Sequence, residues 1–83
     1  MNYGRVLKEA RQQAGYNQSK FAEKLHLGQS DVSKIETDKK EAPFSLIVKW
    51  AQLTGSQEAI AALVCGADVA SILADMFTTT LNV

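Results

Sequence analysis

The sequence has very little cysteine or proline, and it has no long apolar run. Cys65 and Pro43 are the single examples among 83 residues. One cysteine cannot form an internal disulfide, so the chain is not a disulfide-stabilised secreted scaffold. The longest stretch without a charge covers only nine positions, 59–67, and a membrane span needs about 20. The first ten residues also lack the apolar segment of a secretory signal. We therefore expect a cytoplasmic protein with no membrane partner.

An excess of charge is absent too, which argues against a simple nucleic-acid binder. Nine basic residues balance nine acidic ones. The charges are unevenly placed, however. Residues 1–55 hold every basic residue and six acidic ones, a net charge of +3, whereas residues 56–83 hold three acidic residues and no base. A mildly basic first part and an acidic, apolar second part indicate two functions, although a difference this small also permits a chance division.

The residue patterns of catalysis and metal binding are missing as well. The sequence shows no carboxylate pair that a core would hold, no Cys–His pair at a useful spacing and no glycine-rich phosphate loop. Cys65 lies in an apolar helical pattern without an activating base, which is typical of a small core or interface residue. We therefore expect neither an enzyme nor a metal site, and no cofactor.

What the sequence does contain is a strong helical pattern. Hydrophobic residues make up 46% of the chain, too many for a disordered protein, and they recur with a helical rather than an alternating period. The pattern predicts an all-α single domain over residues 1–83 with five to six helices, at about 3–14, 18–25, 29–36, 43–54, 56–65 and 68–77. Asn2, Asn17, Pro43 and Ser56 are expected at helix starts, and Gly15 and Gly55 at helix ends. Residues 78–83 do not reveal their conformation.

Two of these helices form a helix-turn-helix candidate. Residues 18–25 and 29–36 are joined by about three residues, and Ala22 supplies the small side chain that a close crossing needs. The second helix buries only Val32 and Ile35. Because so few apolar residues cannot stabilise a short helix alone, its neighbours must hold it, and it presents a polar face to a partner.

The fourth helix carries two apolar stripes on nearly opposite sides. Phe44, Ile47, Val48 and Ala51 form one stripe, and Leu46, Trp50 and Leu53 form the other. A helix that is apolar on two sides must be covered twice. We expect the first three helices to provide one cover and residues 56–83 to provide the other.

Between Val6 and Gly55 the sequence resembles the lambda-repressor-like (XRE, Cro/cI-type) helix-turn-helix family. The ordered set that carries the resemblance is Arg11, Gly15, Asn17-Gln18, Ala22, Leu25, Val32, Ile35-Glu36 and Lys39. The resemblance implies a sequence-specific transcriptional regulator of a bacterium, phage or mobile element, and a repressor in particular. Its partner would be double-stranded DNA in a bacterial or phage-infected cytoplasm.

The resemblance also implies residue roles. Gln18 would bond a DNA phosphate while touching the recognition helix 29–36, and Arg11 and Glu36 match a buried ion pair, the alternative being separate solvation. Side-chain chemistry agrees, because Gln pairs with adenine, Lys donates to guanine and lysines after the helix grip phosphates. Asp31 either accepts from cytosine or acts locally, the favoured role. The expected DNA-binding residues are Gln18, Gln29, Ser30, Asp31, Ser33, Lys34, Thr37, Lys39 and Lys40.

The turn departs from the family pattern at two positions. His26 stands where the family usually has a glycine with positive φ, so we expect a strained turn residue there rather than a metal ligand or pH switch. Gly28 replaces the usual Ser or Thr cap, and it offers no side-chain contact to a phosphate.

One recognition helix reads only a few base pairs, so we expect a homodimer on a palindromic operator. Residues 56–83 would form the dimer contact, the alternative being that they complete the monomer core. The expected contact residues are Trp50, Leu53, Ile60, Leu63, Val64, Val69, Ile72, Leu73, Met76 and Phe77. The rival function is a protein-interaction module, such as an antitoxin or anti-repressor, whose apolar tail binds a regulatory protein partner.

Overall fold

The computed structural model describes residues 3–66, 68 and 70–74, and within these ranges it contains helices and turns but no strand. The helices are α1 (Gly4–Gln13), α2 (Gln18–Leu25), α3 (Gln29–Glu36), α4 (Phe44–Thr54) and α5 (Gln57–Val64), and residues 70–74 are helical too. The predicted all-α class is confirmed, and the first five helices begin and end within one residue of their predicted bounds. None of the described helices is long and apolar enough to cross a membrane.

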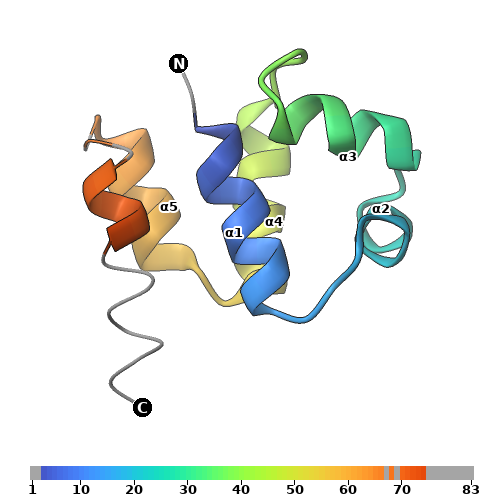
Figure 1. The fold of residues 1–83 in the computed structure, drawn as a ribbon, viewed down its shortest axis with the longest axis horizontal. Coiled ribbons are helices and arrows are strands. Elements are labelled where there is room, and N and C mark those ends of the chain that lie inside the picture. Colours follow the sequence, from blue (N-terminus) through green and yellow to red (C-terminus); the bar gives the residue numbers. More distant parts are fainter. Residues whose placement is uncertain (1–2, 67, 69, 75–83) are drawn as a thin grey trace.

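Helices α1 and α4 lie side by side at the centre of the molecule (Figure 1). Helices α2 and α3 lie on one side of this pair, and α5 lies on the other side with residues 70–74. Helix α1 contacts α3, α4 and α5. It therefore connects the helix-turn-helix half of the molecule with the C-terminal half.

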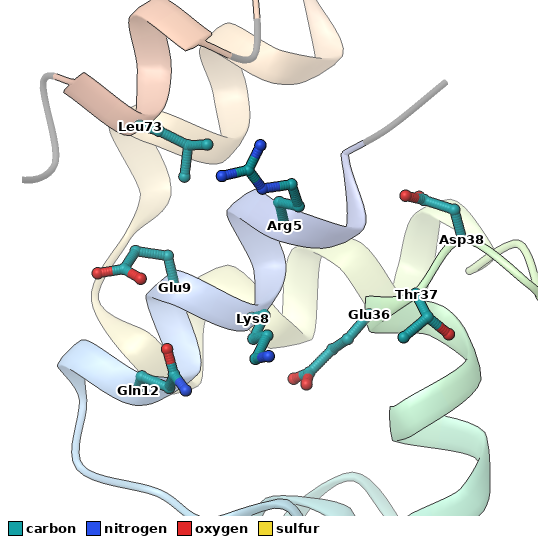
Figure 2. A pocket seen from close by; sticks show the side chains of 8 residues that line it. All are labelled: Arg5, Lys8, Glu9, Gln12, Glu36, Thr37, Asp38 and Leu73. Atoms are coloured by element: carbon teal, nitrogen blue, oxygen red, sulfur yellow. The ribbon is translucent and has the colours of Figure 1, made fainter.

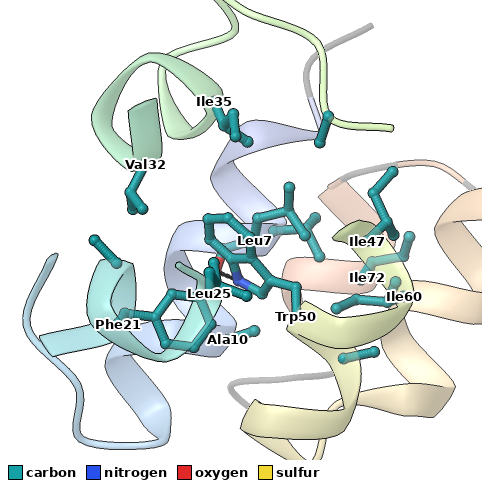
Figure 3. Packing of buried hydrophobic residues seen from close by; sticks show 14 residues of the cluster. Leu7, Ala10, Phe21, Leu25, Val32, Ile35, Ile47, Trp50, Ile60 and Ile72 are labelled. Atoms are coloured by element: carbon teal, nitrogen blue, oxygen red, sulfur yellow. Dashed lines mark hydrogen bonds between the residues drawn. The ribbon is translucent and has the colours of Figure 1, made fainter. Parts of the chain in front are cut away.

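The core is built around Trp50 of α4, which is fully buried. Its indole Nε1 donates to the backbone oxygen of Leu7 at 2.9 Å, so the polar atom of this large side chain is satisfied. The ring of Phe21 meets it edge-on, with ring centroids 4.8 Å apart. Figure 3 shows these side chains between helices from both halves of the molecule. One aromatic pair therefore joins α2 to the central helices.

The C-terminal half completes this core, which was the alternative left open by the sequence. Ile60 and Ile72 are buried in the same cluster as Trp50, and Leu53 and Leu73 pack half-buried against it. The expectation that Trp50, Ile60 and Ile72 face a second copy is therefore corrected, because their own chain already covers them. The other expected contacts, namely the side chains of Leu63 and Val64 and the residues Val69, Met76 and Phe77, lie outside the described part.

Only part of the double cover expected for α4 is present in the described part of the chain. Ile47, Trp50 and Ala51 are buried. Phe44 and Val48, from the same predicted stripe as Ile47, are 65% and 38% exposed. Within the described part of the chain, the cover expected from residues 56–83 is therefore incomplete at these two residues, and residues 75–83 of that expected cover lie outside the described part.

Four helices end in a hydrogen-bonded turn in which one residue adopts the left-handed conformation. These residues are Gly15, His26, Asp38 and Gly55, with φ between 58° and 86°. After α3, for example, the N–H of Asp38 donates to the oxygen of Ile35, and the N–H of Lys39 donates to that of Lys34. The positive φ expected at His26 is confirmed, whereas the one at Asp38 was not foreseen.

The side chain of Asp38 also caps the start of α1. Its Oδ1 accepts the backbone N–H of Gly4 at 3.0 Å, across 34 residues of sequence. Tyr3, at the cap position, makes no side-chain bond of this kind, and the expected cap, Asn2, lies outside the described residues. A β-carbon at Gly4 would lie 2.6 Å from the backbone oxygens of Ile35 and Glu36. The start of α1 and the end of α3 are therefore in direct backbone contact.

Gly4→Ala should lower the free energy of unfolding by about 1–3 kcal/mol, because the new methyl group forces the two helices apart. In an open helix Gly→Ala normally stabilises, so the sign of the change is diagnostic. Urea unfolding followed by circular dichroism measures it, with the exposed neighbour substitution Arg5→Ala as control. A Gly4→Ala variant as stable as the parent would contradict the close contact.

Asp38→Ala should lower the free energy of unfolding by about 1–2 kcal/mol. It removes the acceptor for the Gly4 N–H, and alanine in the left-handed region has no polar side chain to stabilise that conformation. Asp38→Asn should retain most of the stability, because asparagine tolerates this conformation and keeps an acceptor oxygen. The same unfolding experiment compares the two variants. Equal losses for Ala and Asn would show that the acceptor oxygen is unimportant.

Candidate nucleic-acid interface

Helices α2 and α3 form the predicted helix-turn-helix. Ala22 is buried, and its backbone oxygen accepts the N–H of Leu27 at 2.9 Å, which closes the end of α2. His26 makes the turn, and Gly28 then precedes α3 in an extended conformation. Asn17 caps α2 as predicted, since its Oδ1 accepts the N–H of Lys20 at 2.8 Å. The small side chain at Ala22 thus lets the two helices pack closely.

The outer side of α3 is polar and accessible. Gln29, Ser30 and Lys34 are exposed, and Ser33 is half-buried. Val32 and Ile35 lie on the inner side and are buried, as expected. Thr37, just after the helix, donates its hydroxyl to the backbone oxygen of Ser33 at 2.8 Å. The hydroxyl of Thr37 therefore stabilises the end of α3 in this structure.

Asp31 has a local role at the start of α3. Its carboxylate lies 3.0 Å from Lys40 Nζ. The hydrogen bond and the charge of Lys40 lower the pKa of Asp31, and the backbone N–H of Gly28 and the charge of Lys34 lower it further. Asp31 thus remains ionised at neutral pH and offsets part of the Lys40 charge. No ion pair among the described residues involves Lys34 or Lys39.

The expected ion pair between Arg11 and Glu36 is present and buried. Arg11 Nε lies 2.7 Å from Glu36 Oε2, and Nη2 lies 3.1 Å from Oε1. Arg11 Nη1 donates to the backbone oxygen of Tyr16 at 2.7 Å. The two side chains are 6% and 1% exposed. Removing either partner would leave an unpaired buried charge, at a cost of about 3–5 kcal/mol.

A chain of hydrogen bonds runs from this ion pair to the exposed face of α3. Gln18 Nε2 donates to Glu36 Oε1 at 3.1 Å, and Gln29 Nε2 donates to Gln18 Oε1 at 3.5 Å. The Ser19 hydroxyl donates to Gln29 Oε1 at 3.0 Å. The contact of Gln18 with α3 was expected from the resemblance. The contact of Ser19 was not, because nothing in the periodicity distinguishes it from other exposed serines.

An open hollow of about 550 Å³ lies between α1, the end of α3 and Leu73 (Figure 2). Arg5 and Leu73 point towards one another across it, and Glu36 reaches it from the end of α3. Its walls mix the cations Arg5 and Lys8 with carboxylates, so it does not select one sign of charge. The part of the chain that the structure describes holds no group of three or more residues suited to a metal ion.

Comparisons with known proteins agree with this geometry. A family model described as helix-turn-helix matches residues 7–60. The chain is 42% identical over 53 residues to the HTH-type transcriptional regulator ImmR of Bacillus subtilis (strain 168). This alignment covers 64% of the chain but only 42% of that relative, so the chain spans less than half of the relative's length. No solved structure matches the chain. The chain belongs to the XRE-type helix-turn-helix family of DNA-binding transcriptional regulators.

Proposed function

We propose that this protein binds a specific operator with α3 in the major groove and acts as a repressor in the cytoplasm. The observation that carries the proposal is the two-sided character of α3, with buried Val32 and Ile35 on one side and exposed polar residues on the other. A major groove admits one helix of this kind and is read by its first residues. Occupying an operator is enough to exclude other proteins from it, so repression needs no further site.

The proposed base contacts come from the exposed face of α3. Gln29 has both a donor and an acceptor, which suits adenine, and Lys34 donates to the O6 and N7 atoms of guanine. Ser30 and Ser33 are neighbouring candidates on the same helix. Asp31 is bound to Lys40, so we assign it to orientation of that lysine rather than to base reading.

The proposed phosphate contacts surround the same helix. Lys39 and Lys40 lie in the exposed loop after α3, near Thr37. Gln18 lies at the start of α2, where free backbone N–H groups favour an anion. Its Nε2 has a second hydrogen besides the one donated to Glu36. These residues would fix the register of α3 without reading bases.

We further propose a homodimer that reads two half-sites of a palindromic operator. One α3 covers only a few base pairs, and paired half-sites are the usual solution. The surface that supports this proposal is an apolar groove of about 320 Å³ between α4 and α5. Phe44 and Val48, both exposed, line it together with Ala61 and Cys65. A second copy of the chain is the occupant we propose, with Leu53 and Leu73 as half-buried candidates elsewhere.

Lys34→Ala and Lys39→Ala should affect DNA binding in different ways. Lys34→Ala should lose about 1–3 kcal/mol of discrimination at one base position. Lys39→Ala should weaken binding to all sequences similarly and reduce the slope of log affinity against log salt by about 1. Fluorescence anisotropy on selected and random duplexes over a salt series measures both effects.

Selection of bound fragments from genomic DNA would first supply the operator, its symmetry and the half-site spacing. Lys24→Ala, which changes an exposed lysine of α2 outside the proposed contact set, is the matched control. Identical behaviour of the Lys34 and Lys39 variants on both kinds of DNA would contradict the residue roles. Absence of any DNA binding at low salt would favour the protein-interaction function.

Val48→Glu should raise the dimer dissociation constant at least tenfold, because it places an unpaired carboxylate in the apolar groove. Ser45→Glu adds the same charge at an exposed position of α4 that does not line the groove, and it should leave the dimer intact. Sedimentation equilibrium at micromolar concentration gives the mass of each variant. A parent protein at the 9.0 kDa mass of one chain would contradict the homodimer and leave the groove to another protein.

A further inference from the structure

The orientation of the Gln18 side-chain amide is set by the buried ion pair. A carboxylate accepts hydrogen bonds but cannot donate them, and Glu36 already accepts from Arg11 with both oxygens. Gln18 must therefore present its Nε2, not its oxygen, to Glu36. The other end of the same amide, Oε1, then faces Gln29 as an acceptor. A fixed charge in the core thus decides which atom of Gln18 points towards α3.

The orientation of Gln29 follows from its two neighbours. The oxygen of Gln18 accepts, so Gln29 turns its Nε2 towards it, at a rather long 3.5 Å. The oxygen of Gln29 is left on the side of Ser19, whose hydroxyl donates to it at 3.0 Å. The bond from Ser19 is the shorter of the two. Reversing the Gln29 amide would place its oxygen against the oxygen of Gln18, and two acceptors repel one another. One orientation of the Gln29 amide is therefore favoured.

The bonds to Gln18 and Ser19 leave half of the Gln29 capacity unused. Nε2 retains one hydrogen, and Oε1 retains one lone pair. In the major groove adenine presents an acceptor, N7, beside a donor, the N6 amino group. Guanine presents two acceptors at the same edge, N7 and O6. A Gln29 with one donor and one acceptor left, both held in place, therefore matches adenine and not guanine.

We propose that Ser19 is a positioning residue for base recognition, which holds the Gln29 side chain in the rotamer that selects adenine. This inference rests on the proposed DNA-binding function and assigns a specificity role to a residue of α2 that does not itself contact a base. Ser19 is exposed and Asn17, not Ser19, caps α2. Its hydroxyl is therefore not required by the fold, and its removal should change recognition without unfolding the chain.

The test is selection from a library of randomised duplexes, followed by affinity measurements on the selected site and its single-base variants. Gln29→Ala first identifies the base pair that Gln29 reads. Ser19→Ala should then reduce the preference for adenine at that same position by about two- to tenfold, the value of one hydrogen bond. Ser19→Thr keeps a hydroxyl and should preserve the preference. Ser45→Ala, an exposed serine on α4, is the control.

The proposal is supported if Ser19→Ala loses adenine preference at that one position only and keeps its affinity for random DNA. Ser19→Thr should retain the adenine preference. An unchanged adenine preference in Ser19→Ala overturns it while leaving the DNA-binding function intact. A uniform loss at all positions also overturns it, because Ser19 would then act on a phosphate or on the fold. Failure of the parent protein to select any sequence would overturn the proposed function and this inference with it.

Discussion

The buried pair of Arg11 and Glu36 is the interaction on which the rest of the structure depends. Arg11 extends from α1, and Glu36 ends α3, so their paired hydrogen bonds join the central helix to α3. The third guanidinium nitrogen of Arg11, Nη1, fixes the loop between α1 and α2 through the oxygen of Tyr16. Charge-assisted bonds of this kind are strong and directional. A polar pair therefore positions α3, which has too few apolar side chains to position itself.

Close backbone packing beside this pair also holds the end of α3 against α1. The start of α1 lies against the last oxygens of α3, where only glycine fits at position 4. Asp38, in the left-handed turn that ends α3, accepts the N–H of Gly4. The end of α3 is thus attached to α1 by a charged pair, a helix cap and a steric contact. The start of α3 faces outward. It is held by the more exposed hydrogen bonds of Gln18 and Ser19 and by the ion pair of Asp31.

The C-terminal half both completes the core and leaves an apolar groove at the surface, because α4 is apolar on two sides. Ile60 and Ile72 close the core around Trp50, so part of the acidic, apolar segment is needed by a single chain. The same packing leaves Phe44 and Val48 beside a groove that α5 does not fill. Core completion and an outward apolar surface are compatible because Ile47 and Ala51 are buried in the core, whereas Phe44 and Val48 of the same stripe stay exposed beside the groove.

The sequence by itself determined the helices, their order and the family. Helical periodicity, helix caps and the glycines that end helices, such as Gly15 and Gly55, are local features of the chain. It also predicted the polar face of α3, the strained His26 and, through the resemblance, the pair of Arg11 and Glu36. The tertiary structure decided what depends on residues far apart in sequence. Gly4 meets Ile35, Asp38 caps α1, Ser19 holds Gln29, and Trp50 faces inward rather than outward. Periodicity shows that a face is apolar or polar, but only three-dimensional packing shows which neighbour it meets.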